Sequence, residues 1–97
     1  MKVEKKLENG VLFIAILGRL DTLTAPEFEK EVENLEGTRE IILDLKNLDY
    51  LSSAGLRILL RMQKTMNGKG SMKLIHVKPN IMEIFEITGF TDFLNIE

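Results

Sequence analysis

The segment of residues 41–66 joins a short apolar run to a long stretch of helical periodicity, and together these two patterns restrict the possible folds of the chain. The apolar run, residues 41–45, is typical of a buried strand. The helical periodicity begins at Gly55, and Ser52, Ser53 and Ala54 lie between the two. A helix leaves its first backbone N–H groups without partners inside the helix. We therefore expect the two serine hydroxyls to lie beside those groups, and this is where we look for function.

Strand and helix signals alternate on both sides of this segment. Residues 2–8 alternate weakly, and Asn9-Gly10 favours a two-residue hairpin turn. The almost wholly apolar residues 11–17 predict a central strand covered on both faces. Residues 72–77 predict another strand, and residues 93–96 a short closing strand. This order predicts an α/β fold in which a mixed sheet of four to five strands is layered with about four helices, as one domain over residues 1–97.

Two further helices are marked by their terminal residues. Thr24 is the expected N-cap of the first, with Glu27 closing a capping box and Gly37 as its stop. Its core-facing residues are expected to be Phe28, Val32 and Leu35. Pro79 is expected to start the other helix, which runs to residue 87 and is capped by Gly89.

The composition excludes several classes of function. The net charge of −2 argues against nucleic acid as a partner, and the absence of cysteine excludes disulfides and thiol chemistry. No apolar run approaches a membrane span, and the N-terminus lacks the apolar core of a signal peptide, so we expect a cytoplasmic location. His76 is the only histidine, and no group of side chains has metal-ligand spacing. We therefore expect no enzyme activity, no metal site and no cofactor.

The helix that begins at Gly55 carries a basic stripe made of Arg57, Arg61 and Lys64. One interpretation is a well-buried helix with a solvated cationic edge. The other is that Ile58 and Met62 flank the stripe, and together form a docking surface for an acidic partner. Asp21 is expected to organise the loop before the first helix.

Two interpretations also apply to Ser52 and Ser53. Serine is a favoured N-cap, because its hydroxyl satisfies an otherwise unpaired N–H group. One cap needs only one hydroxyl, however, so the second serine is left unexplained. A phosphoryl group at this helix N-terminus would be favoured by the dipole and the free N–H groups. It would add nearly two negative charges at little cost to the fold, which suits a switch that alters binding.

Two stretches closely resemble STAS domains of the anti-sigma factor antagonist type. The first is Gly-Arg-Leu-Asp at residues 18–21 with Thr-Ala-Pro at residues 24–26. The second is residues 42–45 together with Leu-Asp-Tyr-Leu-Ser-Ser-Ala-Gly-Leu at residues 48–56. The resemblance covers essentially the whole chain. Its most specific part is the Ser-Ala-Gly-Leu core.

The resemblance implies an antagonist that binds an anti-sigma factor, itself a serine kinase with a GHKL-type ATP fold. The kinase would phosphorylate the antagonist and release it, and a metal-dependent phosphatase of the PP2C type would reset the switch. Aligned on Gly55-Leu56, the phosphorylated serine of the family falls on Ser53, with Ser52 as second choice. Well-known members carry aspartate at the position of Ser52. The expected partner-binding residues are Asp21, Ser52, Ser53, Gly55, Arg57, Ile58, Arg61 and Met62.

The alternative is a STAS scaffold that is not phosphorylated, either in a signalling assembly or as a subunit of a lipid-transport ATPase. In that case Arg57, Ile58, Arg61 and Met62 would form the docking surface, and Ser53 would only cap the helix. The oligomeric state is open between a monomer and a weak dimer, because an exposed first strand permits pairing.

Overall fold

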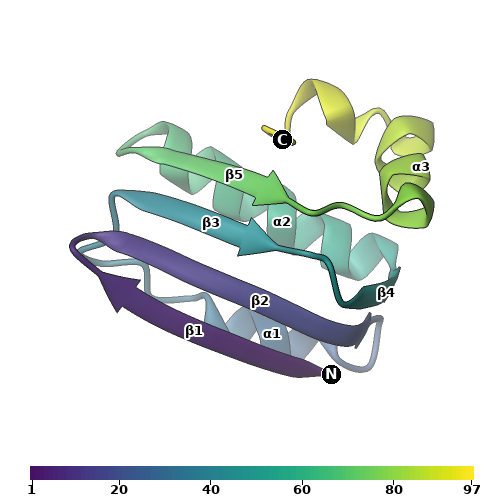
Figure 1. Cartoon of the computed structure of the whole chain (residues 1–97), viewed down its shortest axis with the longest axis horizontal. Helices are drawn as coiled ribbons and strands as arrows, with labels where there is room; N and C mark the ends of the chain where they lie inside the picture. The colour runs from purple at the N-terminus through teal and green to yellow at the C-terminus, as the bar shows by residue number, and fades with distance from the viewer.

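The computed structural model describes residues 1–97 and contains one five-stranded sheet and three α-helices (Figure 1). The elements in chain order are β1 (Lys2–Glu8), β2 (Val11–Leu20), α1 (Ala25–Glu31), β3 (Glu40–Asp44), β4 (Leu48–Leu51), α2 (Ser53–Asn67), β5 (Ser71–Ile75), α3 (Pro79–Thr88) and a 3-10 helix (Phe90–Asp92). The predicted α/β class and mixed sheet are confirmed. The predicted number of helices is corrected to three α-helices and one short 3-10 helix.

The strands follow the order β1-β2-β3-β5 across the sheet, and β4 pairs with the far end of β2. β1 runs antiparallel to β2, and the other pairs are parallel. β4 is absent from the predicted strands, because four residues are too few to show a pattern and the strand depends on pairing of Arg19 with Tyr50 and Leu20 with Leu51. The predicted closing strand is reduced to a single bridge between Leu74 and Ile96.

The hairpin between β1 and β2 forms where the sequence predicts it. Asn9 and Gly10 have φ angles of 52° and 81°, and Glu8 lies opposite Val11. Both central residues of this tight turn need positive φ, which Asn and Gly adopt at low cost. The turn therefore sets the register of β1 against β2.

The helices α1 and α2 lie on one face of the sheet, which leaves the other face open (Figure 1). On β2, Leu12, Ile14 and Ile16 are buried under the helices, whereas Phe13 is 43% exposed on the opposite face. The prediction that residues 11–17 are covered on both faces is therefore wrong. The chain moves from β2 through α1 to β3, and then through β4 and α2 to β5, so both helical connections lead in the same direction across the sheet. Right-handed crossovers in one direction place their helices on the same face.

The helix ends agree only in part with the prediction. Pro79 begins α3 and Gly89 ends it with φ 76°, as expected. Phe28, Val32 and Leu35 are buried as expected, but α1 ends at Glu31, well before Gly37. Beyond that end, the side chain of Asn34 accepts a hydrogen bond from the N–H of Glu36 at 3.0 Å, which competes with continued helix.

Candidate functional site

The strand-loop-helix segment places the two serines in different roles. α2 begins at Ser53, and Ser52 is its N-cap in an extended conformation. The Oγ of Ser52 accepts a hydrogen bond of 3.3 Å from the N–H of Gly55, and its carbonyl accepts one of 2.9 Å from Leu56. Ser53 is exposed at the first helical position. The expectations that the helix begins at Gly55 and that Ser53 is the cap are therefore corrected.

The first turn of α2 lies directly against the sheet through Gly55. Gly55 is buried, and a Cβ there would come within 2.7 Å of the Leu20 side chain and 2.8 Å of the Leu51 side chain. Such contacts are shorter than van der Waals packing allows. Gly55 therefore sets how closely the helix approaches β2 and β4, and it offers little surface to a partner.

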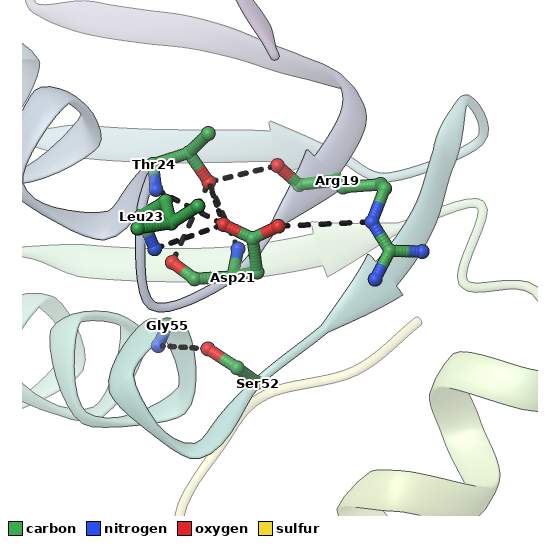
Figure 2. Close-up of polar contacts among 6 residues, drawn as sticks. All are labelled: Arg19, Asp21, Leu23, Thr24, Ser52 and Gly55. Carbon is green, nitrogen blue, oxygen red and sulfur yellow. Dashed lines mark hydrogen bonds and ion pairs between the residues drawn. The ribbon is translucent and has the colours of Figure 1, made fainter.

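The loop between β2 and α1 lies beside this helix start and is held by Asp21 (Figure 2). One carboxylate oxygen of Asp21 accepts hydrogen bonds from the backbone N–H groups of Leu23 and Thr24, both at 3.0 Å. The hydroxyl of Thr24 accepts from the N–H of Asp21 and donates to the carbonyl of Arg19, both at 2.9 Å. These bonds make Asp21 the organiser of the loop, as its position in the sequence suggests.

These hydrogen bonds lower the pKa of Asp21 and leave α1 without the predicted capping box. The backbone N–H of Thr24 is the main cause that lowers the pKa of Asp21, and the nearby Arg19 guanidinium acts in the same direction. Because the Thr24 hydroxyl is engaged in the loop, it makes no cap bond to the helix. Thr24 thus occupies the predicted N-cap position, but the predicted capping box with Glu27 does not form.

The exposed face of α2 carries the basic stripe, whereas its apolar neighbours point inward. Arg57, Arg61 and Lys64 are exposed, and Arg61 forms an ion pair with Glu29 of α1. Ile58 and Met62 are only 5% and 3% exposed and belong to the core. Of the expected docking surface, the arginines are therefore accessible, and the two apolar residues are reached only through the hollows between α1 and α2.

Two shallow hollows run between α1 and α2. One, of about 200 Å³, extends from Thr22 and Pro26 to Ala54 and Arg57, next to Ser53. The other, of about 290 Å³, has a floor of Val32, Leu35, Ile58 and Met62 and a rim that includes Glu33 and Lys69. The first hollow joins the Asp21 loop to the start of α2, so the structure brings these two parts of the predicted site together.

Two exposed residues near the serines are missing from the predicted site. Leu23 is 89% exposed in the loop held by Asp21, and Tyr50 is 40% exposed on β4 with the Arg19 guanidinium 4.3 Å from its ring centroid. An apolar residue among turn residues is the signal that could have singled out Leu23. Tyr50 has no such signal, because its exposure depends on where β4 pairs with β2.

His76 and Asp44 lie apart from the serines, at the ends of β5 and β3. The Nδ1 of His76 is 3.0 Å from Asp44, and His76 has a positive φ of 58°. Burial opposes ionisation of Asp44, but hydrogen bonds from the Lys46 N–H and from His76 outweigh it and lower the pKa of Asp44. The pair links the ends of β3 and β5, and His76 is exposed. The strand predicted over residues 72–77 therefore ends earlier, at Ile75, because His76 adopts a positive φ.

The structure contains no group of three or more His, Cys, Asp or Glu side chains placed to hold a metal ion. None of its helices has both the length and the apolar character needed to cross a membrane.

Known proteins resemble this chain in sequence and in fold. Residues 2–97 match the STAS domain family. A Bordetella bronchiseptica protein named as an anti-sigma factor antagonist, BtrV, is 37% identical over 93 residues, which cover 93% of this chain and 80% of the relative. The crystal structure of an anti-sigma factor antagonist from Mycobacterium paratuberculosis has a TM-score of 0.87 at 20% identity, covering 98% of this chain and 83% of that one.

The Bacillus protein SpoIIAA shares the fold in two solved states. Its unphosphorylated form has a TM-score of 0.84 and its phosphorylated form one of 0.77, both at 15% identity. They cover 99% of this chain and 88% and 91% of the SpoIIAA chains, respectively. The match over nearly the whole chain and the identity to BtrV place the protein in a family: it belongs to the STAS-domain proteins of the anti-sigma factor antagonist type.

Proposed function

We propose that this protein is an anti-sigma factor antagonist that binds a GHKL-type anti-sigma factor serine kinase and is released from it by phosphorylation of Ser53. The observation that carries the proposal is the division of roles between the two serines. The Ser52 hydroxyl accepts the hydrogen bond that caps the helix, whereas Ser53 is exposed at the first helical position. A kinase can therefore reach Ser53 without disturbing the cap.

The surroundings of Ser53 favour a phosphoryl group. The first turn of α2 contains no acidic residue, so no carboxylate within the turn repels the added charge. The helix dipole and its free N–H groups favour an anion at this end. The exposed Arg57 lies four residues further along the same helix, a spacing at which opposite charges attract. Phosphorylation would thus change the charge of this surface by nearly two units and leave the fold intact.

The binding surface in this proposal surrounds Ser53. It combines the rigid Asp21 loop, the arginines of α2 and the hollow of about 200 Å³ between them. A phosphoryl group at its centre would weaken a complex that depends on these contacts, through charge and through steric conflict. A PP2C-type phosphatase would then restore the binding form, and the antagonist itself would supply no catalytic group.

The proposal is tested by intact-mass spectrometry after incubation with ATP, magnesium and GHKL-type kinases from the same genome. We expect a single added phosphate, mapped by fragmentation to Ser53, that is lost on treatment with a PP2C-type phosphatase. Ser53→Ala should abolish the mass increase, and Ser52→Ala should retain it. No phosphate from any kinase, together with retained binding in a pull-down, would instead support the unphosphorylated scaffold.

A further inference from the structure

The sheet has two edge strands, β1 and β5, and the outer side of β5 is partly covered by the bridge between Leu74 and Ile96, whereas β1 has no neighbour on its outer side (Figure 1). Its seven residues pair with β2 without a register shift, contain no proline or glycine, and are all exposed except the half-buried Val3. Natural proteins commonly protect such edges with proline, bulges, short strands or charged side chains, above all lysine. β1 has no proline and no bulge, so its outer side offers an unbroken row of backbone donors and acceptors, but its three lysines require a partner strand with matching charges.

The hairpin turn determines which backbone groups lie on that outer side. In a two-residue hairpin the residues that flank the turn exchange backbone hydrogen bonds, and such pairs recur at every second residue. The flanking pair is Glu8 and Val11, so the even-numbered residues of β1 bond to β2. The N–H and C=O groups of Val3, Lys5 and Leu7 therefore point away from the sheet.

We propose that this edge is a homodimer interface, in which β1 of one copy pairs antiparallel with β1 of a second copy about a two-fold axis at Lys5. The order Lys-Val-Glu-Lys-Lys-Leu-Glu is complementary to itself in this arrangement. Lys2 lies opposite Glu8, Val3 opposite Leu7, and Glu4 opposite Lys6, each pair occurring twice by symmetry. The outward-pointing backbone groups form about six hydrogen bonds between the copies, and the charge pairs fall at the closer, non-hydrogen-bonded positions.

The charges select this register over its neighbours. A shift by one residue turns side chains to the wrong face, so only shifts by two residues compete. One such shift places Lys2 opposite Lys6 and Glu4 opposite Glu4 of the second copy. The opposite shift places Glu4 opposite Glu8 and Lys6 opposite Lys6. Both create like-charge contacts, which destabilise a strand pair.

The two remaining pairs also fit the dimer. Leu7 is 56% exposed on the helix-facing side of the sheet, and the Val3 of a second copy would cover part of it. The two Lys5 side chains meet at the axis, but each already forms an ion pair within its own copy. The Nζ of Lys5 donates a hydrogen bond of 3.0 Å to the carbonyl of Glu31 and lies 3.5 Å from the Glu31 carboxylate.

The test uses two variants with opposite charge along β1. Lys2→Glu with Lys6→Glu makes an acidic strand, and Glu4→Lys with Glu8→Lys makes a basic one. The four side chains are exposed and their pairings within the strand, at 3.6 Å and 3.1 Å, are surface ion pairs, so both variants should fold. Analytical ultracentrifugation across micromolar to millimolar concentrations measures the mass, and circular dichroism checks the fold.

The wild-type mass should rise with concentration from 11.1 kDa towards twice that value. Each variant alone should self-associate about tenfold or more weakly, because all four interstrand charge contacts become repulsive. An equimolar mixture should regain the dimer, since each acidic residue then faces a basic one. The control, Lys30→Glu with Lys64→Glu, makes the same charge change on exposed helix positions and should dimerise like wild type. A wild-type protein that stays monomeric throughout, or variants that dimerise as well as wild type, would overturn the proposal.

Discussion

Ser52 and Gly55 are joined by a hydrogen bond of 3.3 Å from the Gly55 N–H to the Ser52 Oγ, which closes the first turn of α2. This bond separates the roles of two adjacent serines that are chemically identical. Ser52 contributes to the stability of the helix start, and Ser53 remains available for modification.

Ser52→Ala should therefore destabilise the protein more than Ser53→Ala. Loss of an N-cap serine costs about 1 kcal/mol, which lowers the melting temperature of a domain of this size by about 4–8 °C. Ser53→Ala removes an exposed hydroxyl outside the cap and should change stability by less than about 0.5 kcal/mol. Thermal unfolding followed by circular dichroism compares the two. A larger loss for Ser53→Ala would show that Ser53 supplies the cap.

Ser53→Asp should weaken binding to the partner kinase while preserving or slightly raising stability. A negative charge in the first turn of a helix stabilises it by about 0.3–1 kcal/mol, whereas the same charge at the proposed interface opposes binding. Isothermal titration calorimetry with the kinase measures affinity, and thermal unfolding measures stability. Thr65→Asp, exposed near the other end of α2, is the matched control and should bind like wild type. Unchanged affinity of Ser53→Asp would contradict the proposed switch.

Gly55→Ala should destabilise the protein by about 1–3 kcal/mol, because the new Cβ meets Leu20 and Leu51 at 2.7 Å and 2.8 Å. Gly68→Ala is the control: φ is −86° and the nearest atom to the new Cβ is 3.7 Å away. At such a position alanine should be neutral or stabilise by about 0.4–1 kcal/mol, through lower entropy of the unfolded chain. Urea unfolding measures both changes. Equal stability of the two variants would mean that the helix start can move away from the sheet.

The Asp21 loop should become less stable in acid. The backbone N–H of Thr24 is the main cause that holds the pKa of Asp21 below its ordinary value of 3.8. A carboxylate whose folded pKa is lowered stabilises the fold above the unfolded pKa, and this contribution is lost as the pH falls through the folded pKa. Asp21→Asn should therefore be less stable than wild type at neutral pH, with the difference shrinking below about pH 4.

Urea unfolding at several pH values measures this difference directly. Asp44 also has a lowered pKa, but its contribution is common to wild type and Asp21→Asn and cancels in the comparison. A stability difference that stays constant down to strongly acidic pH would show that the Asp21 charge contributes nothing to the loop.

Local chemistry made part of the fold predictable. Asn9-Gly10 favours one tight turn, and Gly89 favours one helix end, because positive φ is a property of the residue type. The strand-loop-helix pattern predicts the start of α2 to within two residues, at Gly55 where the helix begins at Ser53. The choice of Ser52 over Ser53 as the cap cannot be predicted, since both are serine and only the backbone path after β4 decides which one precedes the first helical residue.

Other features depend on contacts between distant parts of the chain. Thr24 has the residue type of an N-cap, yet its hydroxyl bonds to the Asp21 loop, because that loop folds back over the helix start. From their spacing, Ile58 and Met62 are predicted to flank the basic stripe at the surface, but α1 and the sheet pack against them, so they belong to the core. Phe13 sits in a run that predicts burial on both faces, and the common side of the two crossovers leaves it exposed.

The α/β class, the hairpin, the helix-start segment and the charge order of β1 follow from the amino-acid sequence, because each depends on residue type and spacing within a few positions. The cap of α2, the open face of the sheet and the solvent-exposed side chains of α2 emerge only when the chain is folded. These depend on the packing of α1, α2 and β4 against β2, which brings together residues far apart in the chain.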